Sequence, residues 1–281
     1  MELTSPNLSP GSVLAPAIDW LNSNAHDFFA AVTRIIEATL HALESVLLFL
    51  PSYALIGIVA LICLVLLGWR LSVLAAACLG FAALAGLWTA TLQTIALILV
   101  SVLLSVAIAF PLGLWAARHP RVEAIQRPIL DIMQTVPPWV YLIPAVMIFS
   151  LGRVPAIIAT IIYGIPPMLL LTTLAFKQVP QDLRELGAAL GAPPAARLFK
   201  IELPAATPTL LVGLNQCILL SLAMVVLAGL VGAGGLGAEV TRGLTRMEMG
   251  VGLRAGLAIV AVALLLDRLS RSALRKSPTP L

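Results

Sequence analysis

Long apolar runs dominate this sequence and restrict what it can fold into. Of its 281 residues, 60% are hydrophobic and 11% are charged, whereas soluble domains contain about 45–50% apolar and about 25% charged residues. Runs of about 20 apolar residues are long enough to cross a bilayer as helices, and the short alternating segments of a membrane β-barrel do not occur. We therefore predict an all-α integral membrane protein.

Seven stretches are predicted to be transmembrane helices. They cover residues 52–69, 71–88, 91–117, 130–151, 154–176, 204–231 and 250–269. Lysine and arginine in short loops concentrate on the inner side of a membrane, and most of the 17 basic residues fall on that side if the N-terminus lies outside. This distribution predicts an N-out, C-in topology.

The segments around these spans suggest how the chain is organised. Apolar residues between 26 and 50 recur at helical spacing opposite a charged face, which predicts an amphipathic helix at the membrane surface. A contact with a partner protein is the alternative for that helix. We expect a flexible tail over 1–25, the interfacial helix over 26–50, two peripheral transmembrane helices over 51–89, a core over 90–271 with a cytoplasmic loop at 178–204, and a cytoplasmic tail over 272–281.

Several chemical functions are excluded by what the sequence lacks. None of the three lysines follows a glycine, so the phosphate-binding loop of P-loop ATPases is absent. The three cysteines lie in apolar runs and have no metal-site spacing. Because no nucleophile–base set is present either, we expect no enzymatic activity, cofactor, metal or nucleic-acid partner.

The stretch GAGGLG matches the pattern of a dinucleotide-binding loop. That pattern binds a nucleotide only between a strand and a helix, whereas here it follows a predicted span. We interpret it as a flexible, closely packed turn at the outer mouth of the helices. Its glycines are included among candidates for the transport pathway: Gly232, Gly234 and Gly235.

Paired prolines occur in the fourth and fifth predicted spans. A proline removes a backbone donor and frees a carbonyl group, and lipid cannot satisfy such a group. A single proline can be a packing kink, but two pairs favour a pathway or gate built from broken helices. The pairs are Pro137 with Pro138, and Pro166 with Pro167.

Polar and aromatic residues within the spans leave two interpretations open. Asn215 and Gln216 form the strongest polar pair, and they favour hydrogen bonding between helices over contact with a solute. Trp139 and Tyr141 flank a proline pair. These rings could bind a cationic ligand, although anchoring at the membrane interface is the simpler role.

The stretch RELGAALGAPPAARLFKIELP is polar and lies between two predicted spans on the inner side. Asp182 and Glu185 suit the first turn of a helix, and Gly191 followed by two prolines suits its end. A second short helix is expected over 195–203, with Pro204 at the entry to the next span. Two short amphipathic helices at a corner indicate a surface for protein docking rather than a plain connecting loop.

This stretch resembles the cytoplasmic "EAA" loop of the membrane subunits of ABC importers. The pattern E-A-A-x-x-x-G followed by I-x-L-P is matched by Glu185, Gly191, Ile201, Leu203 and Pro204. Leu186 and Gly187 replace the two alanines, which is expected to loosen the first helix slightly. Stretches such as IQRPILDIMQTVPPWVYLIPAVMIFSLGRVPAIIATIIYGIPP and GLNQCILLSLAMVVLAGLVGAGGLG resemble the permease of the ProU-type glycine betaine/proline betaine/choline family.

The resemblance implies a type I importer permease in a bacterial inner membrane. It implies a second copy of the chain, two ATP-binding cassette subunits that bind ATP and Mg²⁺, and a separate extracytoplasmic solute-binding protein. Contact with the ATPase is carried over to these residues: Glu185, Leu186, Gly191, Leu198, Phe199, Leu203 and Pro204. An importer of another small amino-acid-like solute is an alternative, and a secondary carrier or channel is disfavoured because carboxylates are nearly absent from the spans.

Overall fold

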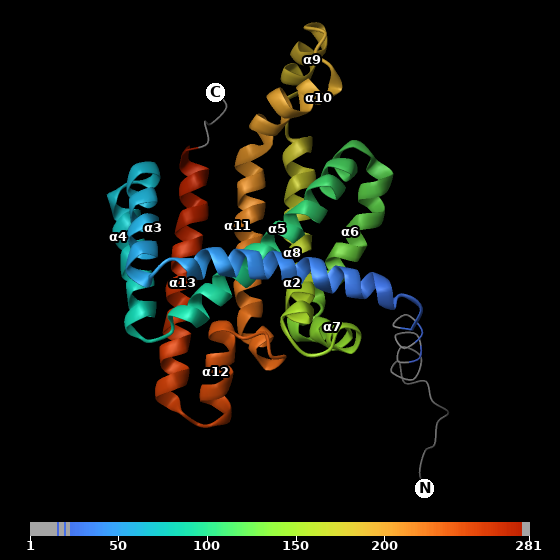
Figure 1. Ribbon diagram of the computed structural model, residues 1–281. Coiled ribbons are helices and arrows are strands. Elements are labelled where there is room, and N and C mark those ends of the chain that lie inside the picture. The colour runs from blue at the N-terminus through green and yellow to red at the C-terminus, as the bar shows by residue number, and fades with distance from the viewer. Residues whose placement is uncertain (1–15, 17–19, 21–22, 277–281) are drawn as a thin grey trace.

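The computed structural model describes residues 16, 20 and 23–276, with side chains up to Ser272. The tails expected at 1–25 and 272–281 lie mostly outside the described residues. From His26 onward the described chain is helical (Figure 1). The helices are α2 (His26–Phe49), α3 (Ser52–Leu67), α4 (Trp69–Leu84), α5 (Trp88–Arg118), α6 (Pro120–Thr135), η1 (Pro138–Tyr141), α7 (Leu142–Phe149), α8 (Arg153–Lys177), α9 (Gln181–Ala189), α10 (Pro194–Arg197), η2 (Leu198–Glu202), α11 (Leu203–Leu230), α12 (Gly235–Thr245) and α13 (Met249–Lys276).

Three long helices, α5, α8 and α11, form the core of the bundle. A helix in lipid satisfies its own backbone hydrogen bonds, and close association between helices then depends on small residues at the contact. Gly164 of α8 is such a residue, because a Cβ there would lie 3.1 Å from Sγ of Cys217 on α11 and 3.2 Å from Oγ of Ser105 on α5. The three helices therefore meet at this glycine.

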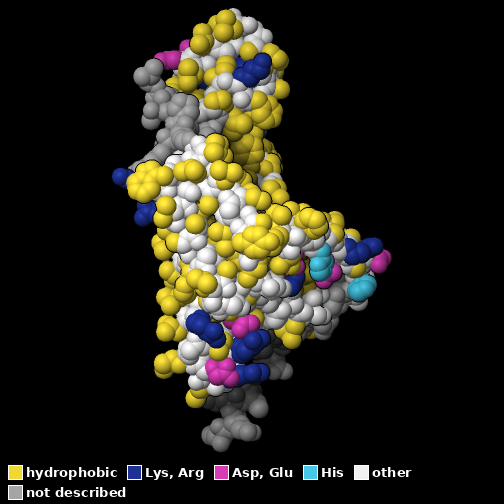
Figure 2. All heavy atoms as spheres, turned by 60° about the vertical axis from the view of Figure 1, so that its left-hand side comes forward, with side chains coloured by type: hydrophobic (Ala, Val, Ile, Leu, Met, Phe, Trp, Pro, Cys, Tyr) yellow, Lys and Arg dark blue, Asp and Glu magenta, His cyan; other side chains and the backbone are white. Residues whose placement is uncertain are grey.

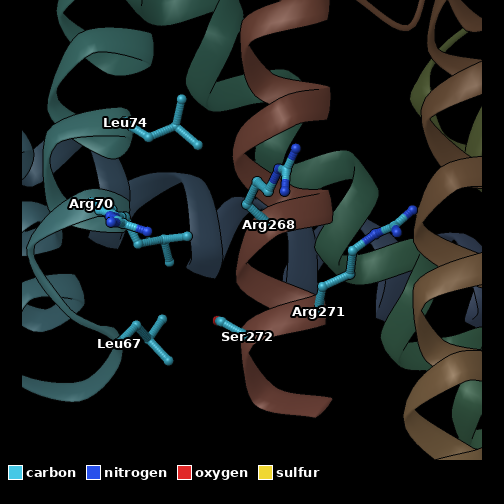
Figure 3. Close-up of a pocket in the computed structure, with 7 residues that line it drawn as sticks. Leu67, Arg70, Leu74, Arg268, Arg271 and Ser272 are labelled. Atoms are coloured by element: carbon cyan, nitrogen blue, oxygen red, sulfur yellow. The ribbon is translucent and has the colours of Figure 1, made fainter. Parts of the chain in front are cut away.

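The α3–α4 hairpin packs on one side of α13 (Figure 1). Gly68 joins the two helices with a φ of 101°, a conformation that glycine adopts without strain. Each helix has 16 residues, about 24 Å at 1.5 Å per residue. Near the end of α13, a pocket opens between α4 and α13 (Figure 3).

Helix α2 crosses the bundle instead of running along it (Figure 1), and it meets α3 at an angle of 98°. Its buried residues Ile36 and Leu40 pack with side chains of α5 and α8. Glu44 is also buried, and both of its carboxylate oxygens accept hydrogen bonds from Nη1 of Arg153, at 2.9 and 2.7 Å. This ion pair fastens α2 to the first residue of α8.

Four described helices are long and apolar enough to cross a membrane singly, and up to six spans result if each sharply bent pair counts as one. The seven predicted spans are thus not seven continuous membrane-length helices. The stretch 130–151 contains parts of α6 and α7, which meet at 106°. Pro137 and Pro138 cannot donate backbone hydrogen bonds, and the helix ends just before them.

The second proline pair does not break its helix, contrary to the sequence-based prediction. Helix α8 continues from Arg153 to Lys177 through Pro166 and Pro167. Pro166 is buried between neighbouring helices, and a transmembrane helix tolerates proline where its neighbours support the backbone. Only the first pair interrupts a span.

The surface has the pattern of a protein that sits in a bilayer. Large apolar side chains cover the middle of the face in Figure 2, while charged side chains gather near its two ends and on one lateral projection. The hairpin of α9 and α10 stands beyond the ends of α8 and α11 at one extremity (Figure 1). The turn between α12 and α13 lies at the opposite extremity.

Candidate functional site

The polar stretch between α8 and α11 forms a hairpin, defined here as residues 181–202. Its first arm is α9, and Gly191 turns the chain with a φ of +67°, in the region that favours glycine at a helix end. Pro194 begins the second arm in the first helical turn, where its missing N–H is not needed. The sequence predicted this corner at the correct residues.

The second arm is not a separate helix. Residues Pro194–Leu230 form one helical run of 37 residues, and the predicted entry to the next span lies in the first turn of α11, at Pro204. A π turn over Leu198–Glu202 precedes it, and the N–H of Leu203 donates to the carbonyl of Leu198. This wider turn accommodates a proline that cannot donate to its preceding turn. The hairpin therefore continues directly into α11.

Gly187 lets the two arms pack closely. It is the one buried residue of α9, and a Cβ there would lie 2.6 Å from Cδ1 of Ile201 and 3.3 Å from Cγ of Arg197. From the resemblance to the EAA loop, we expected that replacing an alanine with Gly187 would loosen the first helix. The structure instead shows that the glycine brings α9 against η2.

The outer surface of the hairpin carries three large apolar side chains. Leu186, Leu190 and Phe199 are 55%, 75% and 61% exposed. Beside them the exposed Glu185 accepts a hydrogen bond from Nε2 of Gln181 at 2.6 Å. Such apolar groups rimmed by polar ones are typical of protein-binding surfaces. Leu198 and Leu203 are only partly exposed, while Pro204 is exposed.

Polar contacts hold the hairpin to the helices below it. Arg118 at the end of α5 donates to Glu202 of η2 at 3.0 Å. A guanidinium N–H of Arg184 on α9 donates to the carbonyl oxygen of Phe176 on α8. Because both arms are tied to the core, a displacement of the hairpin would also move the ends of α5 and α8.

The proline break holds the aromatic candidates. Trp139 is 57% exposed within η1. Tyr141 is partly buried, and its hydroxyl donates to the carbonyl oxygen of Met133 at 2.6 Å, across the break. Its ring lies 6.4 Å from that of Tyr163 on α8. The break at Pro137 and Pro138 therefore lies beside an aromatic pair formed between η1 and α8.

The side chains of Asn215 and Gln216 lie in different environments. Asn215 is buried, and its Oδ1 accepts a hydrogen bond from the hydroxyl of Ser270 on α13. Gln216 is exposed. The two neighbours in sequence therefore do not act as one polar pair, and Asn215 joins α11 to α13.

The glycine-rich stretch turns the chain from α11 into α12. Gly232, Gly234 and Gly235 all have positive φ, at 83°, 79° and 66°. A Cβ on Gly237 would lie 2.0 Å from the carbonyl oxygen of Val225, so the backbones of α11 and α12 touch there. This geometry fits close packing better than a loop that binds a ligand.

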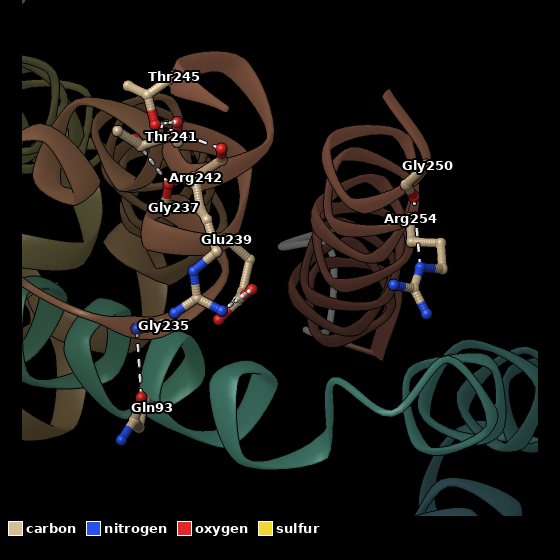
Figure 4. A network of polar contacts seen from close by, with 9 residues as sticks. All are labelled: Gln93, Gly235, Gly237, Glu239, Thr241, Arg242, Thr245, Gly250 and Arg254. Carbon is tan, nitrogen blue, oxygen red and sulfur yellow. Dashed lines mark hydrogen bonds and ion pairs between the residues drawn. The ribbon is translucent and has the colours of Figure 1, made fainter. Parts of the chain in front are cut away.

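Side chains of α5 hold the start of α12, and sequence reasoning did not identify them. Oε1 of Gln93 accepts from the N–H of Gly235 at 3.2 Å (Figure 4), and Oγ1 of Thr94 accepts from the N–H of Leu236 at 2.8 Å. Free N–H groups at a helix start need such acceptors. The sequence feature that could have identified them is that Gln93 and Thr94 are adjacent polar residues within the third predicted span. Among the described residues, no cluster of three or more His, Cys, Asp or Glu side chains could hold a metal ion.

The sequence is similar to a family model and to known transport proteins. The family model described as "Binding-protein-dependent transport system inner membrane component" matches residues 109–275. The chain is 41% identical over 272 residues to the glycine betaine transport system permease protein OpuAB of Bacillus subtilis strain 168, with 95% of each chain covered. It is 40% identical over 266 residues to the glycine betaine/proline betaine transport system permease protein ProW of Escherichia coli strain K12, covering 95% of this chain and 75% of ProW.

A solved structure supports the same architecture. An inward-facing conformation of the MetNI methionine ABC transporter superposes with a TM-score of 0.60 at 21% identity, covering 68% of this chain and 96% of the other. At that identity the likeness bears on the fold alone.

Proposed function

The chain belongs to the family of binding-protein-dependent transport system inner membrane components, and from this premise we propose that it forms the pathway of an importer for glycine betaine and related quaternary ammonium solutes. As a multi-pass inner-membrane permease of an ABC transporter, it is the partner of an ATPase and not the ATPase itself. Membership also implies a solute-binding protein. We propose two copies of the chain and two ATPase subunits for each importer.

The observation that carries this proposal is the hairpin. It presents the exposed side chains of Leu186, Leu190 and Phe199 beyond the helix ends, and its second arm is continuous with α11. An ATPase that holds this surface can move α11 without an intervening flexible joint. Because the chain has no P-loop of its own, the energy for transport must enter through such a contact.

The proposed topology places the hairpin in the cytoplasm. In this arrangement α3, α4, α5, the bent α6–α7 pair, α8, α11 and α13 cross the bilayer, and the chain runs N-out to C-in. Helix α2 then lies along an interface, and the turn between α12 and α13 faces outward. The distribution of Lys and Arg in the loops supports this orientation.

The solute class rests on the relatives. OpuAB and ProW are named for glycine betaine, and both match over 95% of this chain. The exposed ring of Trp139 beside the proline break offers a face that suits a quaternary ammonium group.

Reconstituted transport tests this function. The chain, its ATPase and its binding protein would be placed in proteoliposomes, and uptake of labelled glycine betaine measured with methionine as the control solute. We expect uptake that requires ATP and both partners. Uptake by the chain alone, without ATP, would indicate a carrier or channel, and preferential uptake of methionine would refute the solute class.

A further inference from the structure

A pocket of about 650 Å³ lies between the α3–α4 hairpin and the end of α13 (Figure 3). Three of its lining residues are arginines, and three are leucines on the facing hairpin. The pocket is lined by Leu67, Arg70, Leu71, Leu74, Arg268, Arg271 and Ser272. The pocket shares no residue with the 181–202 hairpin or with the break at Pro137 and Pro138. The proposed solute path therefore does not account for it.

The arginines leave the pocket with unbalanced positive charge. Nε of Arg271 donates to Asp267 at 2.8 Å, which neutralises one of the three guanidinium groups. Within the described part of the chain, no carboxylate pairs with Arg70 or Arg268. Two lining arginines without a carboxylate partner, one on α4 and one on α13 (Figure 3), favour an anionic occupant. Guanidinium suits phosphate because it can donate two parallel hydrogen bonds.

Exposed apolar side chains lie on the same two helices as the leucines of the pocket. Its leucines belong to α3 and α4, where Val65, Leu66 and Val73 are 73%, 55% and 60% exposed. The end of α13 and the α3–α4 turn lie on the same side of the molecule as the 181–202 hairpin (Figure 1), which is the cytoplasmic side in the proposed topology. A charged head and apolar tails would therefore each meet matching surface.

We propose that this pocket binds the phosphate-bearing headgroup of an anionic phospholipid from the cytoplasmic leaflet, with its acyl chains along α3 and α4. Basic pockets between transmembrane helices on this side are suited to such headgroups. The proposal does not depend on which solute is transported.

Lipid titration of the purified full-length chain tests the site. In a neutral detergent, native mass spectrometry would compare binding of phosphatidylglycerol with that of phosphatidylcholine. The double variant Arg70→Gln, Arg268→Gln should bind phosphatidylglycerol about 25-fold more weakly, from about 1 kcal/mol per basic residue near an anionic lipid. Its binding of phosphatidylcholine should not change.

A matched variant removes the same charge elsewhere. Arg121→Gln with Arg127→Gln changes two exposed arginines of α6 and should alter phosphatidylglycerol binding less than twofold. Equal losses in the two double variants, or no preference for phosphatidylglycerol in the unaltered chain, would overturn the proposal. Displacement of the lipid by excess inorganic phosphate would show a site for free anions instead.

Two further measurements keep the test decisive. A photoactivatable phosphatidylglycerol added to the unaltered chain should label peptides that contain 67–74 and 268–272, and labelling only elsewhere would contradict the site even if the variant folds poorly. Co-purification of the ATPase should be the same for both double variants. If Arg70→Gln, Arg268→Gln loses the ATPase but keeps its lipid preference, an acidic protein surface occupies the pocket instead of lipid.

Discussion

Replacing Phe199 with alanine tests the docking surface most directly. Phe199 lies on the π turn that leads into α11, and its side chain is 61% exposed. The substitution removes an apolar group that the fold leaves mostly exposed. The effect should therefore appear in binding of the ATPase and not in the stability of the chain.

The size of the effect follows from the exposed share of the ring. Full burial of a phenylalanine side chain contributes about 1.5–3 kcal/mol. A contact that buries the exposed 61% would recover about 1–2 kcal/mol of this, or about 5–30-fold in the dissociation constant.

The assay is interferometry with the permease immobilised in nanodiscs and its nucleotide-free ATPase in solution. Phe28→Ala provides the control, because Phe28 is similarly exposed, at 65%, but lies on α2. We expect weaker binding for Phe199→Ala, by a factor in the stated range, and unchanged binding for Phe28→Ala. Unaltered affinity for Phe199→Ala, in a variant with the melting temperature of the parent chain, would refute the docking role of this surface.

Three other substitutions probe separate parts of the structure. Gly237→Ala should abolish transport and lower the melting temperature strongly, since its Cβ would lie 2.0 Å from a carbonyl oxygen of α11, whereas Gly256→Ala, with open space around it, should be tolerated. Glu44→Ala should destabilise the chain by about 2 kcal/mol or more, because it leaves Arg153 without its buried partner. The control Glu239→Ala removes an exposed i,i+3 pair and should destabilise the chain by less than about 1 kcal/mol. A thermal shift assay would compare the two variants. Glu185→Lys should leave the chain in the membrane but reduce co-purification of the ATPase, and full retention of the ATPase would contradict a role for this carboxylate.

Local residue chemistry was sufficient to predict several elements from the sequence. The apolar runs predicted helices at α5, α8, α11 and α13 because a helix is the structure that satisfies its own backbone in lipid. Gly191 marked the corner of the hairpin because its backbone conformation is one that other residues rarely adopt. In each case the determining interaction is confined to a few neighbouring residues.

The features that the sequence did not predict depend on contacts between distant residues. Whether a proline pair breaks a helix is decided by its neighbours, so Pro137 interrupts one span while the buried Pro166 does not interrupt another. Gly187 was read as a departure from a motif, because its contact with Ile201 becomes visible only when the two arms are folded together. The cap that Thr94 provides for α12 joins residues 142 positions apart.

The hairpin and the glycine turn lie at opposite ends of one helix, which suggests how they act together. Helix α11 has 28 residues, about 42 Å at 1.5 Å per residue, and its N-terminal end continues from the hairpin without a break. At its C-terminal end a Cβ on Gly229 would lie 2.3 Å from the backbone of Gly237, so no side chain separates α11 from α12 there. Close-packed contacts of this kind shift between discrete arrangements and do not absorb small movements. If the ATPase binds the hairpin as proposed, a displacement of the hairpin is therefore expected to reach the glycine turn as a movement of the whole helix.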